Sequence, residues 1–256
     1  MASIQTLPTG FPAPPLSLLA MEPLRALFDF AAAKFSAAAP AVGDGHPVVV
    51  FPGLGGAPFT TSHLRRFLTD AGFTAHCWGR GVNTGPEGDF DAWLDALEDD
   101  VRRWHAQAGR KVSLVGWSLG GIYARELAKR APDCVRQVIT LGTPFASMRG
   151  ATHAEALYKL LNGDAAQITP ELQARLRACP PVPTTSVYSK SDGVVCWRGC
   201  IEQRTPRSES VEVSASHLGM ATHPDVLRVV IDRLAQPEGQ WRPLRRRESA
   251  GRPAGR

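Results

Sequence analysis

The chain has 256 residues, of which 43% are hydrophobic and 21% charged, which is enough for one globular domain with a sizeable core and too little for two full domains. The formal net charge of +5 lies at the end of the chain, because residues 241–256 hold six arginines and one glutamate and residues 1–240 sum to zero. The body therefore lacks the basic signature of a nucleic-acid-binding domain, and we interpret residues 238–256 as a basic disordered tail.

The cysteines and the first residues of the chain argue against a disulfide-rich, metal-binding, secreted or membrane-spanning protein. The five cysteines are odd in number and scattered, so no disulfide framework is indicated. Cys196 and Cys200 are four residues apart, but no second Cys/His pair of zinc spacing accompanies them, and we expect neither metal nor cofactor. We expect no secretory signal peptide, because the first basic residue is Arg25 and prolines interrupt the early apolar stretch. We also expect no membrane span, because no apolar run is long enough to cross a bilayer. We expect a soluble, cytoplasmic protein.

Residues 1–44 form a Pro-rich arm and an amphipathic helix. Pro23 suits the first turn of this helix, in which apolar residues repeat with helical spacing at Leu24, Leu27, Phe28, Ala31 and Phe35. The apolar face has two interpretations: it packs on the domain or near the mouth of a pocket, or it docks on a membrane surface or lipid aggregate. Residues 38–47 are interpreted as a linker.

Short apolar runs then alternate with helical patterns through residues 45–237. The runs predict strands at 47–51, 73–78, 111–116, 135–141, 184–188 and 210–214. The helical patterns fall at 61–71, 90–108, from the end of the third strand to residue 130, and at 224–234. Continuous Val/Ile/Leu runs separated by helices are typical of a parallel sheet covered on both faces, so we predict a doubly wound α/β domain of about six strands.

Residues 145–183 are too long for a simple connection between two strands. Stretches 154–161 and 170–176 have helical patterns. We predict a helical cap inserted over the carboxyl edge of the sheet, which is the edge where open α/β sheets bind ligands.

The strongest motif of the chain is Gly116-Trp117-Ser118-Leu119-Gly120-Gly121, between the third strand and its helix. A Gly-x-Ser-x-Gly sequence at a strand-to-helix turn is typical of a nucleophile elbow, in which the glycines allow a tight, strained turn and the serine hydroxyl projects from it. Ser118 is the candidate nucleophile.

A serine nucleophile needs a base and a third group that orients the base. His217 follows the last strand and is the preferred base; His223 competes, but Pro224 follows it at the start of the last helix, which favours a capping or surface role. Asp192 follows the fifth strand and is the candidate acid, although Asp192-Gly193 by itself is also typical of a simple turn. The chain order Ser118, Asp192, His217 places all three after strand ends.

An acyl-transfer site also needs hydrogen-bond donors for the developing oxyanion. We predict the backbone N–H of Leu119, which follows the serine, and that of Leu54 in the Gly-rich segment 51–56 after the first strand. This segment lacks the lysine of a phosphate-binding P-loop and the spacing of a dinucleotide-binding loop.

These motifs together resemble the α/β-hydrolase superfamily, specifically the small bacterial lipase and esterase type. The resemblance covers about residues 48–234, with the first two of the family's eight strands lacking. Two further segments, 81–86 and 141–144, are similar to that group and are interpreted as pocket floor and cap hinge or as purely structural turns. Many members carry His-Gly before the oxyanion residue, whereas this chain has Pro52-Gly53, which keeps the backbone donor and changes the pocket wall near Leu54.

The resemblance implies a serine hydrolase that cleaves carboxylic esters, with a small molecule or lipid ester as substrate. Apolar residues are predicted to contact the acyl chain, with a cap that packs its own small core as the alternative; they are Phe59, Phe145, Leu157, Leu161, Leu160 and Ile168. An acyltransferase or thioesterase would use the same triad, and a non-catalytic binding protein on this scaffold is the alternative from another class. The oligomeric state is not predicted.

Overall fold

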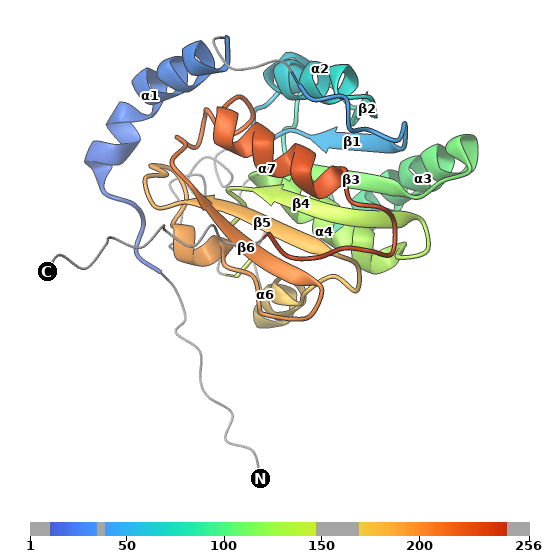
Figure 1. Ribbon diagram of the computed structural model, residues 1–256. Coiled ribbons are helices and arrows are strands. Elements are labelled where there is room, and N and C mark those ends of the chain that lie inside the picture. The colour runs from blue at the N-terminus through green and yellow to red at the C-terminus, as the bar shows by residue number, and fades with distance from the viewer. Residues whose placement is uncertain (1–10, 35–38, 147–168, 245–256) are drawn as a thin grey trace, which may run out of the picture.

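A six-stranded, fully parallel sheet forms the centre of the computed structural model, which describes residues 11–34, 39–146 and 169–244 (Figure 1). The strand order is β2-β1-β3-β4-β5-β6. The strands are β1 (Pro47–Phe51), β2 (Thr74–Cys77), β3 (Val112–Trp117), β4 (Val135–Leu141), β5 (Thr184–Ser189) and β6 (Ser208–Val213). Every predicted strand is present, with ends that differ by at most two residues, and the predicted doubly wound sheet is confirmed.

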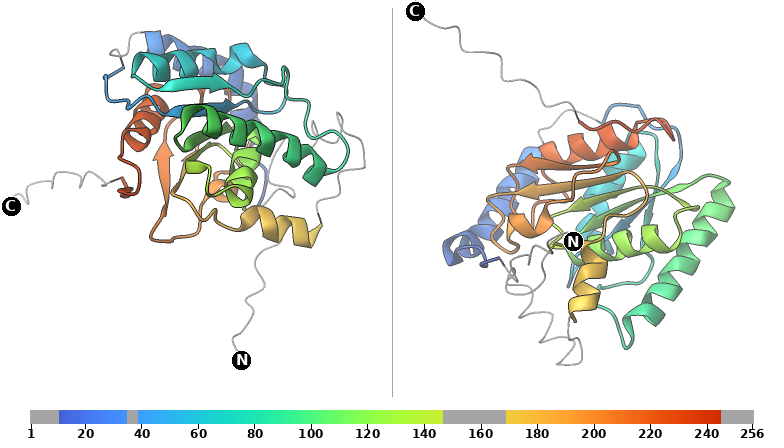
Figure 2. Two further views of the ribbon diagram at one scale, coloured as in Figure 1. Left: turned by 90° about the vertical axis from the view of Figure 1, so that its right-hand side faces the viewer. Right: turned by 90° about the horizontal axis from the view of Figure 1, so that it is seen from below.

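Helices cover both faces of this sheet (Figures 1 and 2). On one face lie α2 (Ser62–Asp70) and α7 (Pro224–Leu234), and on the other lie α3 (Phe90–Ala108) and α4 (Leu119–Arg130). The chain starts at β1, moves outward to β2, and returns to β3 on the other side of β1. The direction of winding therefore reverses between β1 and β3, and ligands of open α/β sheets bind outside the carboxyl ends of strands at such a point.

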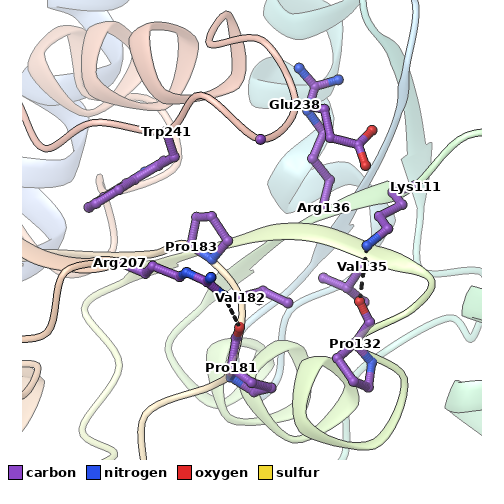
Figure 3. A pocket seen from close by; sticks show the side chains of 11 residues that line it. Lys111, Pro132, Val135, Arg136, Pro181, Val182, Pro183, Arg207, Glu238 and Trp241 are labelled. Atoms are coloured by element: carbon purple, nitrogen blue, oxygen red, sulfur yellow. Dashed lines mark hydrogen bonds between the residues drawn. The ribbon is translucent and has the colours of Figure 1, made fainter.

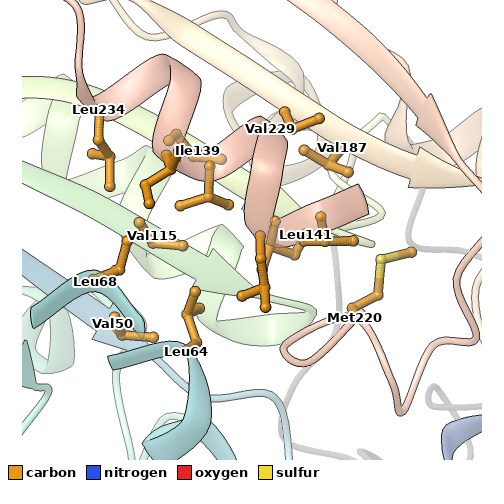
Figure 4. Close-up of a cluster of buried hydrophobic side chains, with 14 of the residues drawn as sticks. Val50, Leu64, Leu68, Val115, Ile139, Leu141, Val187, Met220, Val229 and Leu234 are labelled. Carbon is orange, nitrogen blue, oxygen red and sulfur yellow. The ribbon is translucent and has the colours of Figure 1, made fainter. Parts of the chain in front are cut away.

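The core consists of two layers because strand side chains alternate between the faces. In β1, Val48 and Val50 pack with α2 and α7 in the cluster of Figure 4, whereas Val49 and Phe51 pack with α3 and α4. All five residues of β1 are buried. Burial on both faces explains the uninterrupted apolar run in the sequence.

The N-terminal helix differs from the prediction. Helix α1 spans Leu16–Lys34, so Pro23 lies in its interior and not in its first turn. The helix begins earlier because the carbonyl of Pro15 already accepts hydrogen bonds from the N–H groups of Leu18 and Leu19. An interior proline removes one helical hydrogen bond, which contacts with the rest of the protein must offset.

Apolar side chains of α1 are exposed, and a charged side chain of the same helix is buried. Leu27 and Phe28 are 62% and 65% exposed, whereas the carboxylate residue Glu22 is 1% exposed. No helix in the described parts of the chain combines the length and hydropathy needed to cross a bilayer.

Only part of the predicted cap falls within the described residues. Helix α6 (Pro170–Arg177) coincides with the second predicted helical stretch and packs against α4, where Arg175 forms an ion pair with Glu126 at 2.7 Å. The first predicted stretch, 154–161, lies outside the described residues, as do Phe35 and the part of the predicted tail from residue 245 onward.

Candidate active site

Ser118 lies in the turn from β3 to α4 with φ at 52° and ψ at −120°. Among the described residues it is the one non-glycine residue with a positive φ. Hydrogen bonds fix this turn: the Ser118 N–H donates to the Leu141 carbonyl at 2.8 Å, and the Ser118 carbonyl accepts from Thr143 Oγ1 at 2.9 Å and from the Gly121 N–H at 3.0 Å. This strained turn is the conformation that the predicted nucleophile elbow requires.

The glycines of the motif are required by close packing. A Cβ on Gly120 would lie 2.5 Å from the carbonyl oxygen of Phe51 in β1, and one on Gly116 would collide with the backbone of Gly120 and Gly121. A side chain at either position would therefore push α4 away from the strands that carry it.

Asp192 follows β5 and is buried. Its Oδ1 accepts hydrogen bonds from the N–H groups of Val194 and Val195 at 2.8 and 2.7 Å, which is a turn of the kind that Asp-Gly favours. Its Oδ2 lies 2.7 Å from Nδ1 of His217. The turn orients the carboxylate, so the two interpretations of Asp192-Gly193 describe one structure.

His217 follows β6 and is buried beside the elbow. Its carbonyl accepts a hydrogen bond from Nε1 of Trp117, the residue before Ser118, at 3.1 Å, and the two rings are 6.1 Å apart between centroids. Burial by itself lowers the pKa of His217, but the charge and hydrogen bond of Asp192 and the charge of Glu22 outweigh it, so the pKa is raised above 6.5. With Nδ1–H donated to Asp192, Nε2 carries the lone pair that a general base needs.

His223 has a different role in the structure. It is the N-cap of α7, where its Nδ1 accepts a hydrogen bond from the Asp225 N–H at 3.1 Å. Its Nε2 lies 3.8 Å from Asp29 of α1. The structure thus brings Asp192 to His217 and leaves His223 at a helix end, as the sequence favours.

The Gly-rich loop after β1 meets the elbow. A Cβ on Gly53 would lie 3.2 Å from Cβ of Ser118, which puts Leu54 next to the serine turn. Leu119 is the first residue of α4, so its N–H has no acceptor within the helix. Both predicted donors thus belong to segments that meet at Ser118.

Asn83 holds this loop in place. It is fully buried, its Nδ2 donates to the Pro52 carbonyl at 2.8 Å, and its backbone exchanges hydrogen bonds with Gly55 and Gly56 at 2.7 and 2.8 Å. Tyr123 of α4 donates its hydroxyl to Asn83 Oδ1 at 3.1 Å. The sequence marked the segment 81–86 without indicating which residue mattered, because a buried asparagine is recognisable only from its partners.

A comparison with protein families shows the family of this chain. Residues 48–250 match the model described as "Alpha/beta hydrolase family". The chain belongs to the alpha/beta hydrolase family. The chain is also 32% identical over 108 residues to the serine hydrolase BPHL of Mus musculus; the match covers 40% of this chain and 37% of that protein.

Solved structures of low sequence identity share the fold. Aspergillus fumigatus lipase B has a TM-score of 0.60 at 16% identity and covers 80% of this chain and 56% of its own. Bacillus licheniformis lipase BlEst2 in its mature form gives 0.56 at 18% identity, with 79% and 94% covered. The monoacylglycerol lipase of Paleococcus ferrophilus gives 0.52 at 16% identity, with 75% and 96% covered.

The residues predicted to contact the acyl chain are in unlike surroundings. Phe59 of the 3₁₀ helix η1 (Pro58–Thr61) is 76% exposed. Phe145 is fully buried, with the Arg125 guanidinium 3.6 Å from its ring centroid. Leu157 and Leu161 lie outside the described residues, as do Leu160 and Ile168.

A cavity of about 390 Å³ lies at the opposite edge of the sheet (Figure 3). Its lining includes Lys111, Val135, Pro183 and Arg207, which lie at the amino ends of β3 to β6. It is therefore remote from the serine, aspartate and histidine at the carboxyl ends. In the described parts of the chain, no cluster of His, Cys, Asp and Glu is arranged to hold a metal ion.

The sequence did not predict Glu22 of α1 as a residue of the site. Its carboxylate accepts hydrogen bonds from the N–H groups of Gly193, His217 and Leu218. These contacts cross more than 170 positions in the sequence, and no local pattern around residue 22 signals them.

Proposed function

We propose that this alpha/beta hydrolase is a serine hydrolase that cleaves carboxylic esters through an acyl-enzyme. The observation that carries the proposal is the convergence at one sheet edge of a serine in a strained elbow with a buried histidine–carboxylate pair at 2.7 Å. Family membership and the lipase folds among its structural neighbours support the same reaction class.

The chemistry follows from the protonation states of the pair. Asp192 keeps the proton of His217 on Nδ1, so Nε2 accepts the proton of the Ser118 hydroxyl as the oxygen attacks the ester carbonyl carbon. The N–H groups of Leu54 and Leu119 donate to the oxyanion that forms.

Collapse of the tetrahedral intermediate breaks the bond to the alcohol, which leaves with the proton from His217 Nε2. Water then attacks the acyl-enzyme, gives its proton to His217, and the carboxylic acid is released as Ser118 regains its proton. Ser118, Asp192 and His217 are the catalytic residues of this proposal, and the substrate is an ester with an apolar acyl group. Phe59, Phe145, Leu157 and Leu161 remain proposed acyl-chain contacts.

A fluorophosphonate probe and a series of p-nitrophenyl esters of increasing acyl length test the proposal. We expect the wild-type protein to form one covalent adduct at Ser118 and to release free acid. Ser118→Ala should abolish the adduct and lower kcat by about 10⁵-fold or more, because loss of a serine nucleophile removes the whole covalent pathway. Ser62→Ala, which removes an exposed serine hydroxyl in α2, is the matched control and should label and turn over like the wild type.

The outcomes separate the rival functions. Absence of both adduct and acid release from the wild-type protein would mean a non-catalytic scaffold. An adduct on the wild type with acyl transfer to added alcohol or thiol, and no free acid, would reassign the enzyme as a transferase.

A further inference from the structure

Helix α1 buries a carboxylate and exposes most of its large apolar side chains. Glu22 is 1% exposed on the same helix that leaves Leu27 and Phe28 more than half exposed. Burial of a charged carboxylate is costly unless hydrogen bonds compensate it. The contacts of Glu22 therefore indicate what this helix does.

The two oxygens of Glu22 bind both loops of the histidine–carboxylate pair. Oε1 accepts hydrogen bonds from the Gly193 N–H at 2.7 Å and the His217 N–H at 3.0 Å, and Oε2 accepts from the Leu218 N–H at 3.0 Å. Gly193 is the residue after Asp192. One side chain thus ties the turn that carries the acid to the loop that carries the base.

Neighbouring residues of α1 extend this contact. Arg25 donates to the carbonyl and, at 2.8 Å, to the hydroxyl of Ser191, and Asp29 Oδ2 accepts from the Ser216 N–H at 2.9 Å. Positions 22, 25 and 29 share one helix face, with spacings of three and four residues. This polar face lies on the segments 191–193 and 216–218.

The helix backbone also approaches these segments closely. A Cβ on Gly193 would lie 2.5 Å from the carbonyl carbon and oxygen of Leu18. Glycine at this position lets α1 lie directly on the turn after Asp192. The contact is therefore tight enough to set the position of that turn.

Charged groups reach His217 from two elements. Asp192 follows β5, and Glu22 of α1 carries a second negative charge, with Arg25 at 3.8 Å from Glu22 Oε1. Asp29 and His223 form a separate pair at 3.8 Å beyond Ser216. Both carboxylates that face His217 favour its protonated form, which explains why its pKa is raised in spite of burial.

We infer that Glu22 is a positioning residue for the catalytic pair, and that α1 completes the active site by holding the Asp192 turn and the His217 loop together. The inference rests on the proposed function. It assigns to Glu22 two actions: three backbone hydrogen bonds that set the geometry, and a negative charge that stabilises the imidazolium formed when His217 takes the serine proton.

Three variants separate these actions. Glu22→Gln keeps the size, removes the charge, and presents an NH₂ group to one of the three backbone donors. Glu22→Asp keeps the charge and shortens the reach by one methylene. Glu212→Gln is the matched control, because Glu212 of β6 is exposed, pairs with Lys190 at 2.9 Å, and is not one of the charges that shift the pKa of His217.

In ester hydrolysis we expect Glu22→Gln to lower kcat at least tenfold with little change in KM, since Glu22 is buried behind the pair and does not line the substrate side. The acid limb of the kcat/KM profile should move to lower pH, because loss of a negative charge lowers the pKa of His217. Glu22→Asp should lower kcat while the limb stays nearer its wild-type position. Glu212→Gln should match the wild type in both.

A second measurement is independent of turnover. Titration of the His217 imidazole resonances by NMR in the folded full-length protein should give a lower pKa for Glu22→Gln than for the wild type and for Glu212→Gln. An unchanged His217 pKa, or a fall in activity that only follows the folded fraction and leaves the acid limb in place, would reduce Glu22 to a structural residue and overturn the inference. Failure of the proposed function shows separately, as a wild-type protein that forms no fluorophosphonate adduct.

Discussion

The neighbours of Ser118 hold its backbone in an unfavourable conformation with a positive φ. A non-glycine residue in so sparsely populated a backbone conformation is destabilised by about 1–3 kcal/mol, and hydrogen bonds with Leu141 of β4, Thr143 after β4 and Gly121 of α4 hold Ser118 there. His217 is likewise placed by its surroundings, through Asp192 on Nδ1 and Trp117 on its carbonyl. His223, six residues later, has its Nδ1 committed to the helix end.

The two histidines provide a direct test of this difference. His217→Ala should lower kcat for p-nitrophenyl esters by about 10⁵-fold or more, as removal of the base in a serine triad does. His223→Ala should retain kcat within a few-fold and lose about 1 kcal/mol of unfolding free energy, because it removes an N-cap. Steady-state kinetics and urea unfolding measure both. Retained turnover in His217→Ala with loss in His223→Ala would transfer the role of base to His223.

Among the elements, the contact of α4 with β1 decides where the serine turn lies. Gly120, in the first turn of α4, packs against the carbonyls of Phe51 and Pro52. The helix can approach the strand only without a side chain at this position. The orientation of Ser118 therefore depends on a helix–strand contact and not on the turn alone.

Gly120→Ala should cost about 3 kcal/mol, at the upper end of overpacking effects, because the atoms it meets are backbone. Gly109→Ala is the comparison: Gly109 ends α3 at φ 60° with open space around it, so the cost is conformational and about 1–2 kcal/mol. Urea unfolding measures the free energies, and ester hydrolysis should fall in Gly120→Ala alone. Equal costs in the two variants would contradict the packing argument.

The elements also show where sequence prediction succeeds and where it fails. Strand β1 is predicted residue for residue because its apolar run is bounded by Pro47 and the glycines after Phe51. Helix α1 is predicted as amphipathic, but most of its large apolar side chains are exposed and the carboxylate of Glu22 is buried. Periodicity indicates that a helix has two faces, and the partner decides which of them is buried.

Across the whole molecule, the two edges of the sheet have different tasks. The carboxyl edge carries the candidate site. At the amino edge, a cluster of charged side chains holds neighbouring strands together. There Asp44 pairs with Arg110 and Arg136 at 2.7 and 2.8 Å and lies 2.5 Å from His46, whose Nε2 meets Ser113 at 2.8 Å. These contacts join the segment before β1 to β3 and β4.

His46 makes the stability of the whole domain depend on pH. Its pKa is lowered below 6.5, first by burial and then by the nearby arginines, with Asp44 acting in the opposite direction. The unfolded chain therefore binds a proton as pH falls below about 6.5 while folded His46 does not, and the unfolding free energy declines from that pH down to the folded-state pKa. His217, with a raised pKa, contributes the opposite slope, because its stabilising effect is lost as pH rises through its folded-state pKa.

We expect the unfolding free energy to fall between pH 7 and pH 5 in the wild type. It should fall less steeply in His46→Asn, which no longer titrates in this range. Urea unfolding at a series of pH values measures the difference between the two slopes. Identical slopes would show that His46 is not the group responsible.

The sequence by itself determined the strands, the helices that follow them, the parallel sheet and the order Ser118, Asp192, His217, because each depends on local patterns: apolar runs, turn residues and the placement of motifs after strand ends. Only the tertiary structure decided that Asp192 meets His217 at 2.7 Å and that Asn83 holds the Gly-rich loop after β1. It also decided that Glu22 lies buried behind Asp192 and His217. The physical reason is that a buried polar side chain is stabilised by partners far away in the chain. Those partners exist as a set only once the sheet has brought the strand ends together.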